Sequence, residues 1–243
     1  MERFLKEMSY KIKIQRYQQS SSYQEEFEVK EKVKTLLEAL YQIKSQIDSS
    51  LSFDFNCKSG ICGACAVRVD GKEALACSFK LKKREYLVEP LRYYEIKRDL
   101  IVDKSKNRAL LLASKASLNS YKETILTPAD EAKTQLQSDC ILCSSCYSSC
   151  PVVEVNSNFK GPFALSRVYR YLEDRREGSK VAIDAIQKDG IWDCTLCGEC
   201  TLVCPQGIDP KGDILNLRAL STQAGYFDPN FTNMDFGLNF NSF

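Results

Sequence analysis

The sequence predicts an α+β protein of two domains, and three observations lead to this prediction. Apolar and polar residues alternate in much of the first half, which is typical of strands. From about residue 107 the apolar residues recur at helical spacing instead. The 12 cysteines fall into three groups of four, one in the first half and two in the second. A chain of 243 residues is long enough to give each half a core of its own.

Two β-hairpins, one helix and a last strand are expected in the first half. Residues 8–30 predict a β-hairpin with its turn in the polar stretch 18–24. Residues 31–47 carry valine, leucine and isoleucine at helical spacing and predict an amphipathic helix. A second hairpin is predicted over residues 67–75, around an Asp-Gly pair, and residues 86–88 form the last strand. The resulting order is β-β-α-β-β.

Helices are expected throughout the second half. Apolar residues recur at helical spacing in residues 109–116 and again in residues 181–186. A Gly-Pro pair at residues 161–162 places a proline where a helix can begin. Asp213 is predicted to be the N-cap of a helix over residues 214–220, because its carboxylate can accept the free N–H groups of the first turn.

The composition argues against several classes of function. With 34 basic and 32 acidic residues, the chain lacks the basic surplus of nucleic-acid-binding proteins, so no nucleic-acid partner is expected. The absence of histidine excludes a Rieske centre, histidine-ligated haem and Cys2His2 zinc, and it removes the commonest acid–base group. Because no apolar run approaches the roughly 20 residues of a membrane span, and residues 1–20 lack a signal-peptide core, we expect neither membrane spanning nor self-directed export.

The first cysteine group has the spacing C-x4-C-x2-C-x11-C of plant-type [2Fe–2S] ferredoxins. Its members are Cys57, Cys62, Cys65 and Cys77. Soft thiolates suit iron, and each iron of a [2Fe–2S] cluster takes two of them. Gly60 and Gly63 allow the loop to turn tightly and to bring N–H groups close to the sulfurs. The cysteines favour the β-grasp fold of plant-type ferredoxins for the β-β-α-β-β half, over any other α+β domain of that order.

The other two cysteine groups share the spacing C-x2-C-x2-C-x3-C-P of bacterial two-cluster ferredoxins, within the repeat DCILCSSCYSSCP and DCTLCGECTLVCP. In such runs the first three cysteines bind one cluster and the fourth binds the other. We therefore assign one [4Fe–4S] cluster to Cys140, Cys143, Cys146 and Cys204. A second [4Fe–4S] cluster is assigned to Cys150, Cys194, Cys197 and Cys200. Crossed ligation would hold the two clusters close together, as electron hopping requires, so the chain is most simply an electron relay.

Two other uses of the cysteines compete with iron–sulfur clusters. Disulfides suit small secreted chains rather than closely spaced C-x2-C groups in a chain of this size. Zinc is the common alternative for paired C-x2-C motifs, and a zinc-stabilised interaction module without redox function is the remote reading. Two complete two-cluster runs beside a plant-type run favour iron–sulfur clusters instead.

The chain resembles the iron–sulfur subunit of succinate dehydrogenase and fumarate reductase over roughly residues 8–220. The resemblance lies in the first cluster region LSFDFNCKSGICGACAVRVDGKEALAC at 51–77, in Arg-Asp-Leu at 98–100 with Val-Asp at 102–103, and in the motif around residues 161–170. It implies a chain that carries electrons between an FAD-containing flavoprotein, where succinate and fumarate interconvert, and a membrane-associated subunit that handles quinone. The acid–base chemistry would belong to the flavoprotein, so no catalytic residue is expected here.

Cys197 departs from the usual pattern of this family, which has an apolar residue at that position and a three-ligand [3Fe–4S] cluster. A fourth thiolate at Cys197 makes a [4Fe–4S] cluster the physical expectation. The alternative is a [3Fe–4S] cluster with Cys197 pointing away from it.

A second departure concerns the quinone site. Many members of the family carry a tryptophan shortly after the second cysteine run and a histidine within the third. Here those positions belong to the stretch 152–155 and to Thr195, and the single tryptophan is Trp192. We therefore expect no conventional quinone site. The resemblance to the family's unusual branch implies electron transfer to a further, cysteine-rich membrane-associated subunit and only indirectly to quinone.

The domain boundaries are expected at 1–105 for the [2Fe–2S] domain with its connector and 106–221 for the two-cluster domain. Residues 222–243 form a phenylalanine-rich tail that either frays or packs on a partner. The complex is expected at the membrane periphery on the cytoplasmic face, with the opposite face, after co-export with a partner, as the alternative. An iron–sulfur subunit of another flavin oxidoreductase, such as a thiol-linked fumarate reductase, is the alternative function.

Overall fold

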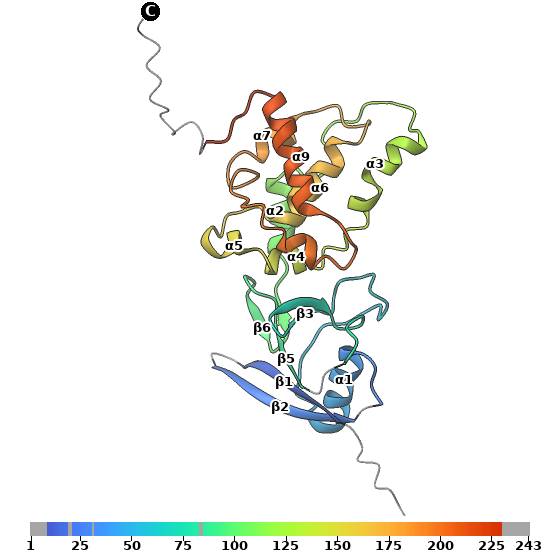
Figure 1. The fold of residues 1–243 in the computed structure, drawn as a ribbon, viewed down its shortest axis with the longest axis vertical. Helices are drawn as coiled ribbons and strands as arrows, with labels where there is room; N and C mark the ends of the chain where they lie inside the picture. The colour runs from blue at the N-terminus through green and yellow to red at the C-terminus, as the bar shows by residue number, and fades with distance from the viewer. Residues whose placement is uncertain (1–8, 19–20, 31, 83–84, 230–243) are drawn as a thin grey trace, which may run out of the picture.

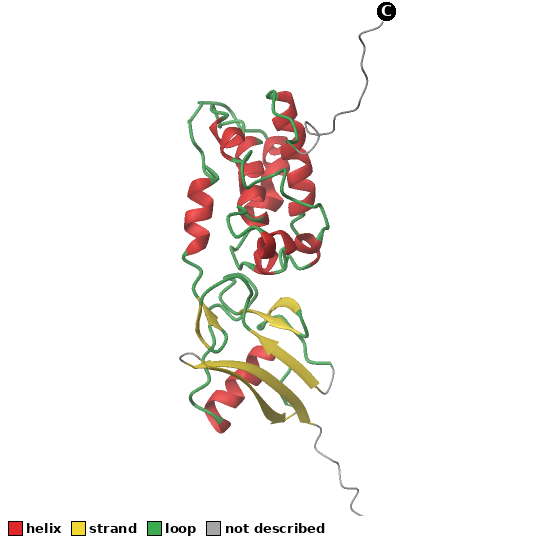
Figure 2. Ribbon diagram, turned by 90° about the vertical axis from the view of Figure 1, so that its left-hand side faces the viewer, coloured by secondary structure: helices red, strands yellow, loops and turns green. Residues whose placement is uncertain are grey.

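The computed structural model describes residues 9–18, 21–30, 32–82 and 85–229. Strands and helices separate along the chain: the strands lie in one half of the molecule, and all described helices but the first lie in the other (Figures 1 and 2).

A five-stranded sheet of order β2-β1-β5-β3-β4 forms the first half. Its strands are β1 (Ser9–Gln18), β2 (Ser21–Lys30), β3 (Ala66–Val69), β4 (Lys72–Leu75) and β5 (Glu85–Glu89). The hairpins β1–β2 and β3–β4 are antiparallel, whereas β5 runs parallel to β1. Both predicted hairpins are confirmed, but the first turn is shorter than predicted. Strand pairing continues to Gln18 opposite Ser21, so the polar residues from Ser21 belong to β2, whose exposed side tolerates them.

One helix covers this sheet. Ile12, Ile14 and Val29 are fully buried, and so is Leu36 of helix α1 (Leu36–Gln42). The predicted helix 31–47 begins later than expected because the side chain of Thr35 accepts the N–H of Glu38 and acts as N-cap. Its last part is a π-helix, η1 (Ile43–Ile47).

The connector between the halves is more ordered than a simple linker. Residues 91–105 contain β6 (Ile96–Arg98) and β7 (Ile101–Val102), which form a small antiparallel sheet. Arg16 of β1 is 2% exposed, and its Nε donates to Oδ1 of Asp99 at 2.9 Å. Its Nη1 lies 2.6 Å from a carboxylate oxygen of Asp48, just after η1. This buried ion pair fixes the connector to the first half.

The described residues of the second half form eight helices. They are α2 (Lys106–Ala113), α3 (Pro128–Ser138), α4 (Ser145–Ser148), α5 (Pro151–Val155), α6 (Pro162–Leu172), α7 (Val181–Ala185), α8 (Glu199–Leu202) and α9 (Pro210–Gln223). Proline opens α3, α5, α6 and α9, where its missing N–H costs nothing. The predicted helices after the Gly-Pro pair and at 181–186 are confirmed by α6 and α7.

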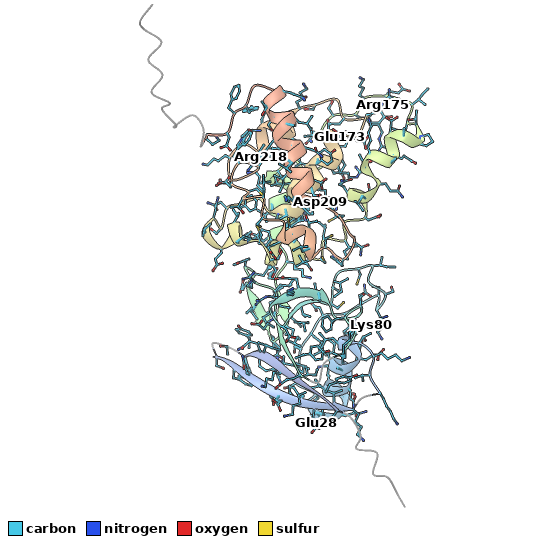
Figure 3. The ribbon with its side chains drawn as sticks, in the orientation of Figure 1. Glu28, Lys80, Glu173, Arg175, Asp209 and Arg218 are labelled. Atoms are coloured by element: carbon cyan, nitrogen blue, oxygen red, sulfur yellow. The ribbon has the colours of Figure 1, made fainter. Side chains whose placement is uncertain are left out.

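Asp213 is not the helix cap that the sequence predicts. The N-cap of α9 is Asp209, whose carboxylate accepts the N–H of Gly212 at 3.1 Å; Asp209 and Arg218 of the same helix are labelled in Figure 3. Asp213 lies one turn inside α9 and is 3% exposed. It accepts hydrogen bonds from Gln137 of α3, at 2.8 Å, and from Ser166 of α6. It therefore joins three helices, and burial raises its pKa to about 6.

The two halves meet where the first cysteine loop contacts the second. Gly63 packs so closely on Cys143 that a Cβ at residue 63 would lie 2.8 Å from the Cβ of Cys143. Beside this contact, Gln206 Nε2 donates to the carbonyl of Gly60 at 3.0 Å. At the other side, Ser148 Oγ donates to the buried carboxylate of Glu73 at 2.7 Å. Backbone contact and buried hydrogen bonds thus set how the halves join.

Asp213→Asn should remove a pH dependence of stability. The pKa of Asp213 is about 6 in the folded chain and about 3.9 in unfolded chains. The folded state therefore binds the proton more tightly, so the free energy of unfolding falls as pH rises from about 4 to 6. At pH 8 we expect the variant to be about 2–3 kcal/mol more stable than the parent. At pH 4 the gain should vanish, as measured by urea unfolding of anaerobic protein.

Asp184→Asn is the matched control for that measurement, because Asp184 is exposed. If the two variants shift stability equally at pH 4 and pH 8, the burial of Asp213 is not the cause.

Gly63→Ala should destabilise the chain more than Gly60→Ala. Both glycines have a positive φ, 69° at Gly63 and 79° at Gly60, so alanine has a similar backbone cost of roughly 1–2 kcal/mol at either position. Only at Gly63 would the new Cβ strike the backbone of a neighbour, Cys143 Cα at 2.9 Å; at Gly60 it would meet the rotatable Ser78 Oγ at 3.1 Å. We expect a melting temperature about 2–4 °C lower for Gly63→Ala than for Gly60→Ala. Equal melting temperatures would contradict the contact.

Candidate functional site

The first cysteine loop is wrapped around the sulfur of Cys57. Backbone N–H groups of Ser59, Ile61 and Cys62 donate to Cys57 Sγ over 3.3–3.4 Å. The loop reaches this geometry through positive φ angles at Lys58 and Gly60. These hydrogen bonds, that of Ser59 first, lower the pKa of Cys57 to about 6. The thiolate, which is the form that binds iron, is thereby favoured.

The other members of the first group lie close to one another at the end of the sheet. Cys65 immediately precedes β3, and its carbonyl accepts the N–H of Ala76 next to Cys77. Burial raises the pKa of Cys65 to about 11, and negative charge on the neighbouring Cys77 and Cys62 adds to this effect. Positive iron would reverse both penalties. Residues from the loop and from two strand ends thus converge on one site.

A small cavity lies in the second half. Four cysteines line it: Cys140, Cys143, Cys146 and Cys204. The remaining lining is largely apolar and includes Phe163 and Ile208. Burial raises the pKa of Cys146 well above its ordinary value, and negative charge on its cysteine neighbours raises it further. Four soft donors around an apolar cavity fit a [4Fe–4S] cluster, whose positive iron would stabilise the thiolates.

The remaining four cysteines, Cys150, Cys194, Cys197 and Cys200, also form one group in space. Burial raises the pKa of Cys200 to about 12, and negative charge on Cys194, Cys150 and Cys197 contributes in the same direction. The pKa of Cys150 is likewise raised first by burial and then by Cys194 and Cys197. Cys197 is the exposed member, yet it acts electrostatically on the other three. The fourth thiol of the second run, Cys150, therefore lies with the third run.

The sequence repeat is also a repeat of backbone conformation. Leu142 and Ser144 in the second run have φ of 51° and 75°, and their counterparts Leu196 and Gly198 have φ of 56° and 87°. Glycine adopts this left-handed conformation without cost, whereas a serine does so only when its surroundings hold it.

A buried hydrogen-bond chain holds Ser144 in this conformation. Asn107 Nδ2 donates to Ser144 Oγ at 2.8 Å, and Tyr94 Oη donates to Asn107 Oδ1 at 2.7 Å. All three residues are buried. The sequence does not predict these hydrogen bonds, because no local motif marks them. The one sequence signal is that Ser144 stands where the repeat has Gly198.

No compact site for a single metal ion is found among the described residues. Among the described residues, no three His, Cys, Asp or Glu side chains converge tightly enough to hold one ion. Four thiolates on one zinc, at about 2.3 Å each, would lie only about 3.8 Å apart. A cluster places several irons between its thiolates and accepts wider spacing.

The single tryptophan and the residues at the expected quinone-site positions have different surroundings. Trp192 Nε1 donates to Gln187 Oε1 at 2.8 Å, and the Arg218 guanidinium lies 5.5 Å from its ring centre. Val155 and Thr195 are exposed. Within the described part of the chain, no helix has the length and apolar character to cross a bilayer.

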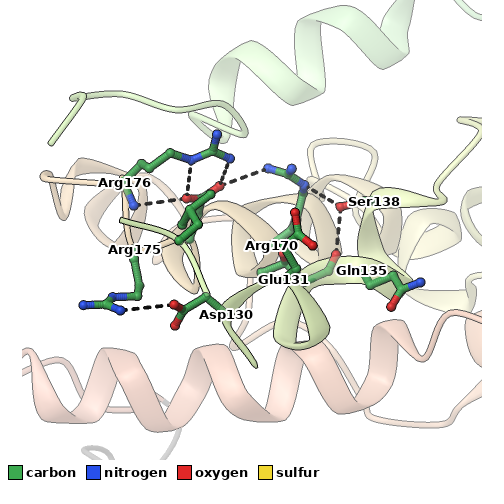
Figure 4. Close-up of a pocket in the computed structure, with 10 residues that line it drawn as sticks. Asp130, Glu131, Gln135, Ser138, Arg170, Arg175 and Arg176 are labelled. Atoms are coloured by element: carbon green, nitrogen blue, oxygen red, sulfur yellow. Dashed lines mark hydrogen bonds and ion pairs between the residues drawn. The ribbon is translucent and has the colours of Figure 1, made fainter. Parts of the chain in front are cut away.

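A surface pocket of about 410 Å³ lies between α3 and the end of α6 (Figure 4). Its three arginines are matched by carboxylates. Arg175 pairs with Asp130 at 3.1 Å, and Arg176 pairs with Asp174 at 2.7 Å. Since its charges are already balanced, this pocket presents no evident anion site among the described residues.

Comparison with known proteins agrees with the geometry. Residues 11–109 match a 2Fe-2S iron-sulfur cluster binding domain, and residues 137–208 match a 4Fe-4S dicluster domain. The chain therefore carries binding domains for both cluster types.

Two relatives and one solved structure cover most of the chain. The fumarate reductase iron-sulfur subunit of Mycobacterium tuberculosis is 37% identical over 74% of this chain and 77% of the relative. A subunit of the fumarate reductase (CoM/CoB) of Methanothermobacter marburgensis is 33% identical over 81% of this chain but only 40% of the relative. The Mycobacterium smegmatis Sdh1 complex contains a chain with the same fold, at TM-score 0.82 and 21% identity, over 91% of this chain and 98% of that one.

The resemblance to succinate dehydrogenase and fumarate reductase rests on identity above 30% across more than two thirds of a relative, together with both cluster domains in the same order. The chain belongs to the family of iron–sulfur subunits of succinate dehydrogenase and fumarate reductase.

Proposed function

We propose that this chain relays electrons between an FAD-containing flavoprotein, where succinate and fumarate interconvert, and a membrane-associated subunit linked to quinone. The observation that carries the proposal is the serial contact of the three cysteine groups. Gly63 of the first loop touches Cys143 of the second group. Cys146 of that group lies within electrostatic reach of Cys200 of the third. Three redox sites in series form a path for electrons.

The proposed ligand sets keep the crossed arrangement. The first cluster would be held by Cys57, Cys62, Cys65 and Cys77. The second would be held by Cys140, Cys143, Cys146 and Cys204, and the third by Cys150, Cys194, Cys197 and Cys200. The shared cavity of the second set and the mutual effects on cysteine pKa within the third support these assignments.

The bound clusters would supply one-electron redox capacity; the protein supplies thiolates, apolar walls and hydrogen bonds. Backbone N–H groups directed at Cys57 stabilise negative charge on its sulfur. Phe163 and Ile208 keep water from the second site. We assign no catalytic residue to this chain, because hydride and proton chemistry on succinate would occur at the flavoprotein.

We further propose the finer domain description. Residues 1–105 would form a β-grasp [2Fe–2S] domain with its connector, supported by helix α1 packed on the mixed sheet. Residues 106–221 would form a helical two-cluster domain, although α9 continues to Gln223. Most of the tail 222–243 lies outside the described residues, and its packing on a partner stays a prediction.

The third cluster is proposed to be [4Fe–4S] rather than [3Fe–4S]. Support comes from the electrostatic proximity of Cys197 to Cys150, Cys194 and Cys200. The residues at 152–155 and Thr195, which stand where many family members carry a tryptophan and a histidine, support the absence of a conventional quinone site from the described part of this chain. Electrons would then pass to a cysteine-rich membrane-associated subunit and reach quinone only indirectly.

We place the complex at the membrane periphery, on the cytoplasmic face, with the opposite face after co-export as the alternative.

A thiol-linked fumarate reductase is the second candidate function. It is favoured by the 33% identity, over 81% of this chain, to the methanogen protein named as a fumarate reductase (CoM/CoB) subunit. This chain spans only 40% of that relative, so the relative holds further regions that the match does not cover.

Anaerobic co-purification separates the two functions. We expect the chain to co-purify with a flavoprotein, and succinate to reduce the clusters of that complex within the mixing time. The isolated chain should not turn over succinate, because it holds no flavin chemistry. Reduction by dithiol substrates but not by succinate or a quinol would favour the thiol-linked function. Recovery of a colourless protein with stoichiometric zinc would overturn both.

Cys197→Ser should convert the third cluster to a three-iron form. The parent should hold about ten irons per chain and show no EPR signal when oxidised. The variant should lose about one iron and gain a strong oxidised-state signal, because only three cysteines then remain at that site. Thr195→Ala, an exposed neighbour, is the control and should match the parent. A parent with about nine irons and the oxidised-state signal would mean that Cys197 is not a ligand.

A further inference from the structure

Lys104 lies at the junction of the first two cysteine groups. It follows the short sheet β6–β7 and precedes α2, so it belongs to the segment that joins the two halves. Its Nζ donates to the carbonyl of Gly63 at 3.2 Å. Gly63 is the residue that packs directly on Cys143. The ammonium therefore sits beside the backbone contact across which the first and second sites meet.

The surroundings of Lys104 are dominated by cysteines of both groups. Cys143 of the second group, and Cys65 and Cys62 of the first, favour the charged ammonium electrostatically, as does the carboxylate of Asp54. Burial acts in the opposite direction and, as the largest influence, lowers the pKa of Lys104. The cysteines that act on this ammonium thus belong to the first two of the three sites, and the carboxylate of Asp54 acts beside them.

The adjacent acid does not neutralise Lys104. The carboxylate of Asp103 pairs with Lys97 Nζ at 3.1 Å and accepts the N–H of Ser105 at 2.8 Å. Lys97 itself is 57% exposed, so water screens its charge. Two lysines near each other in sequence therefore differ in their surroundings. Lys104 is near cysteines of two groups and Asp54, whereas Lys97 is exposed and pairs with Asp103.

We propose that Lys104 is a positioning and tuning residue that raises the reduction potentials of the first and second clusters together. The inference rests on the proposed ligand sets. Reduction adds one electron, and hence one negative charge, to a cluster, without forming or breaking a bond to Lys104. A cation held in a partly buried site favours the reduced state of each cluster near it. The electron arrives from the flavoprotein and leaves to the third cluster.

One cation near two clusters acts differently from a separate cation at each cluster. It shifts the potentials of both clusters in the same direction, so it raises both relative to the third while changing the difference between them little. The hydrogen bond to Gly63 holds the cation at the contact between the loops. Lys104 therefore contacts the junction and also influences the reduction potentials of the two clusters that meet there.

Lys104→Met tests the proposal by EPR-monitored redox titration of the anaerobically purified complex. Methionine keeps an unbranched side chain of similar length and removes the charge. We expect the reduction equilibrium constants of the first and second clusters to fall at least tenfold each, which is a downward shift of about 59 mV for a one-electron couple. The third cluster should be unchanged and serves as an internal reference. Unchanged potentials of the first two clusters at full iron content would overturn the proposal.

Three further variants separate charge from structure. Lys104→Arg keeps the charge and should keep both potentials near those of the parent. Lys104→Gln can still donate to the Gly63 carbonyl but carries no charge, so it should behave like Lys104→Met. If Lys104→Met loses iron, the comparison of the glutamine and arginine variants decides the question. Lys97→Met removes a charge from an exposed site and should leave all potentials unchanged.

An equal shift of all three clusters in Lys104→Met would also overturn the proposal, because it would indicate a general effect of net charge. The outcome is independent of the proposed partners. The iron content and the separate EPR signals of the parent report whether three clusters exist at all. The titration then reports only the effect of Lys104 on two of them.

Discussion

The contact between Gly63 and Cys143 is the constraint on which the rest of the structure depends. At this point two loops that belong to different halves approach so closely that no side chain fits on residue 63. The hydrogen bonds from Gln206 to Gly60 and from Lys104 to Gly63 reinforce the same junction. The connector carries Lys104 and is itself tied to the sheet by the ion pair of Arg16 with Asp99. The arrangement of strands and helices around this junction brings the first two cysteine groups into series.

The same junction explains why metal and fold depend on each other. Several of the cysteines are buried, and burial raises their pKa, as at Cys65, Cys146 and Cys200. Without a cation, ionising such groups beside one another in a buried site costs free energy. Positive iron turns that cost into a favourable interaction, so cluster binding and folding are thermodynamically linked. Lys104 and the N–H groups at Cys57 then adjust how much negative charge each site tolerates.

The features that the sequence predicts correctly are those with a local cause. Examples are the cysteine spacing, the Asp-Gly turn and the proline that opens α6. Each acts within a few residues, so its pattern can be recognised in the sequence alone. The prediction of Asp213 as a cap is wrong because its true environment comes from Gln137 and Ser166 on two other helices. Lys104 has no sequence signal at all, since its importance arises from loops distant along the chain. The roles of Asp213 and Lys104 both depend on tertiary contacts, which the sequence does not show.

An experimental structure of the anaerobic protein, with anomalous diffraction recorded at the iron absorption edge, tests the central claim most directly. We expect three separate iron groups, with the second bound by Cys140, Cys143, Cys146 and Cys204 and the third bound by Cys150 together with Cys194, Cys197 and Cys200. Ligation of each cubane wholly within its own run, with Cys150 and Cys204 exchanged between the clusters, would contradict this arrangement. So would single metal ions at any of the three cysteine groups.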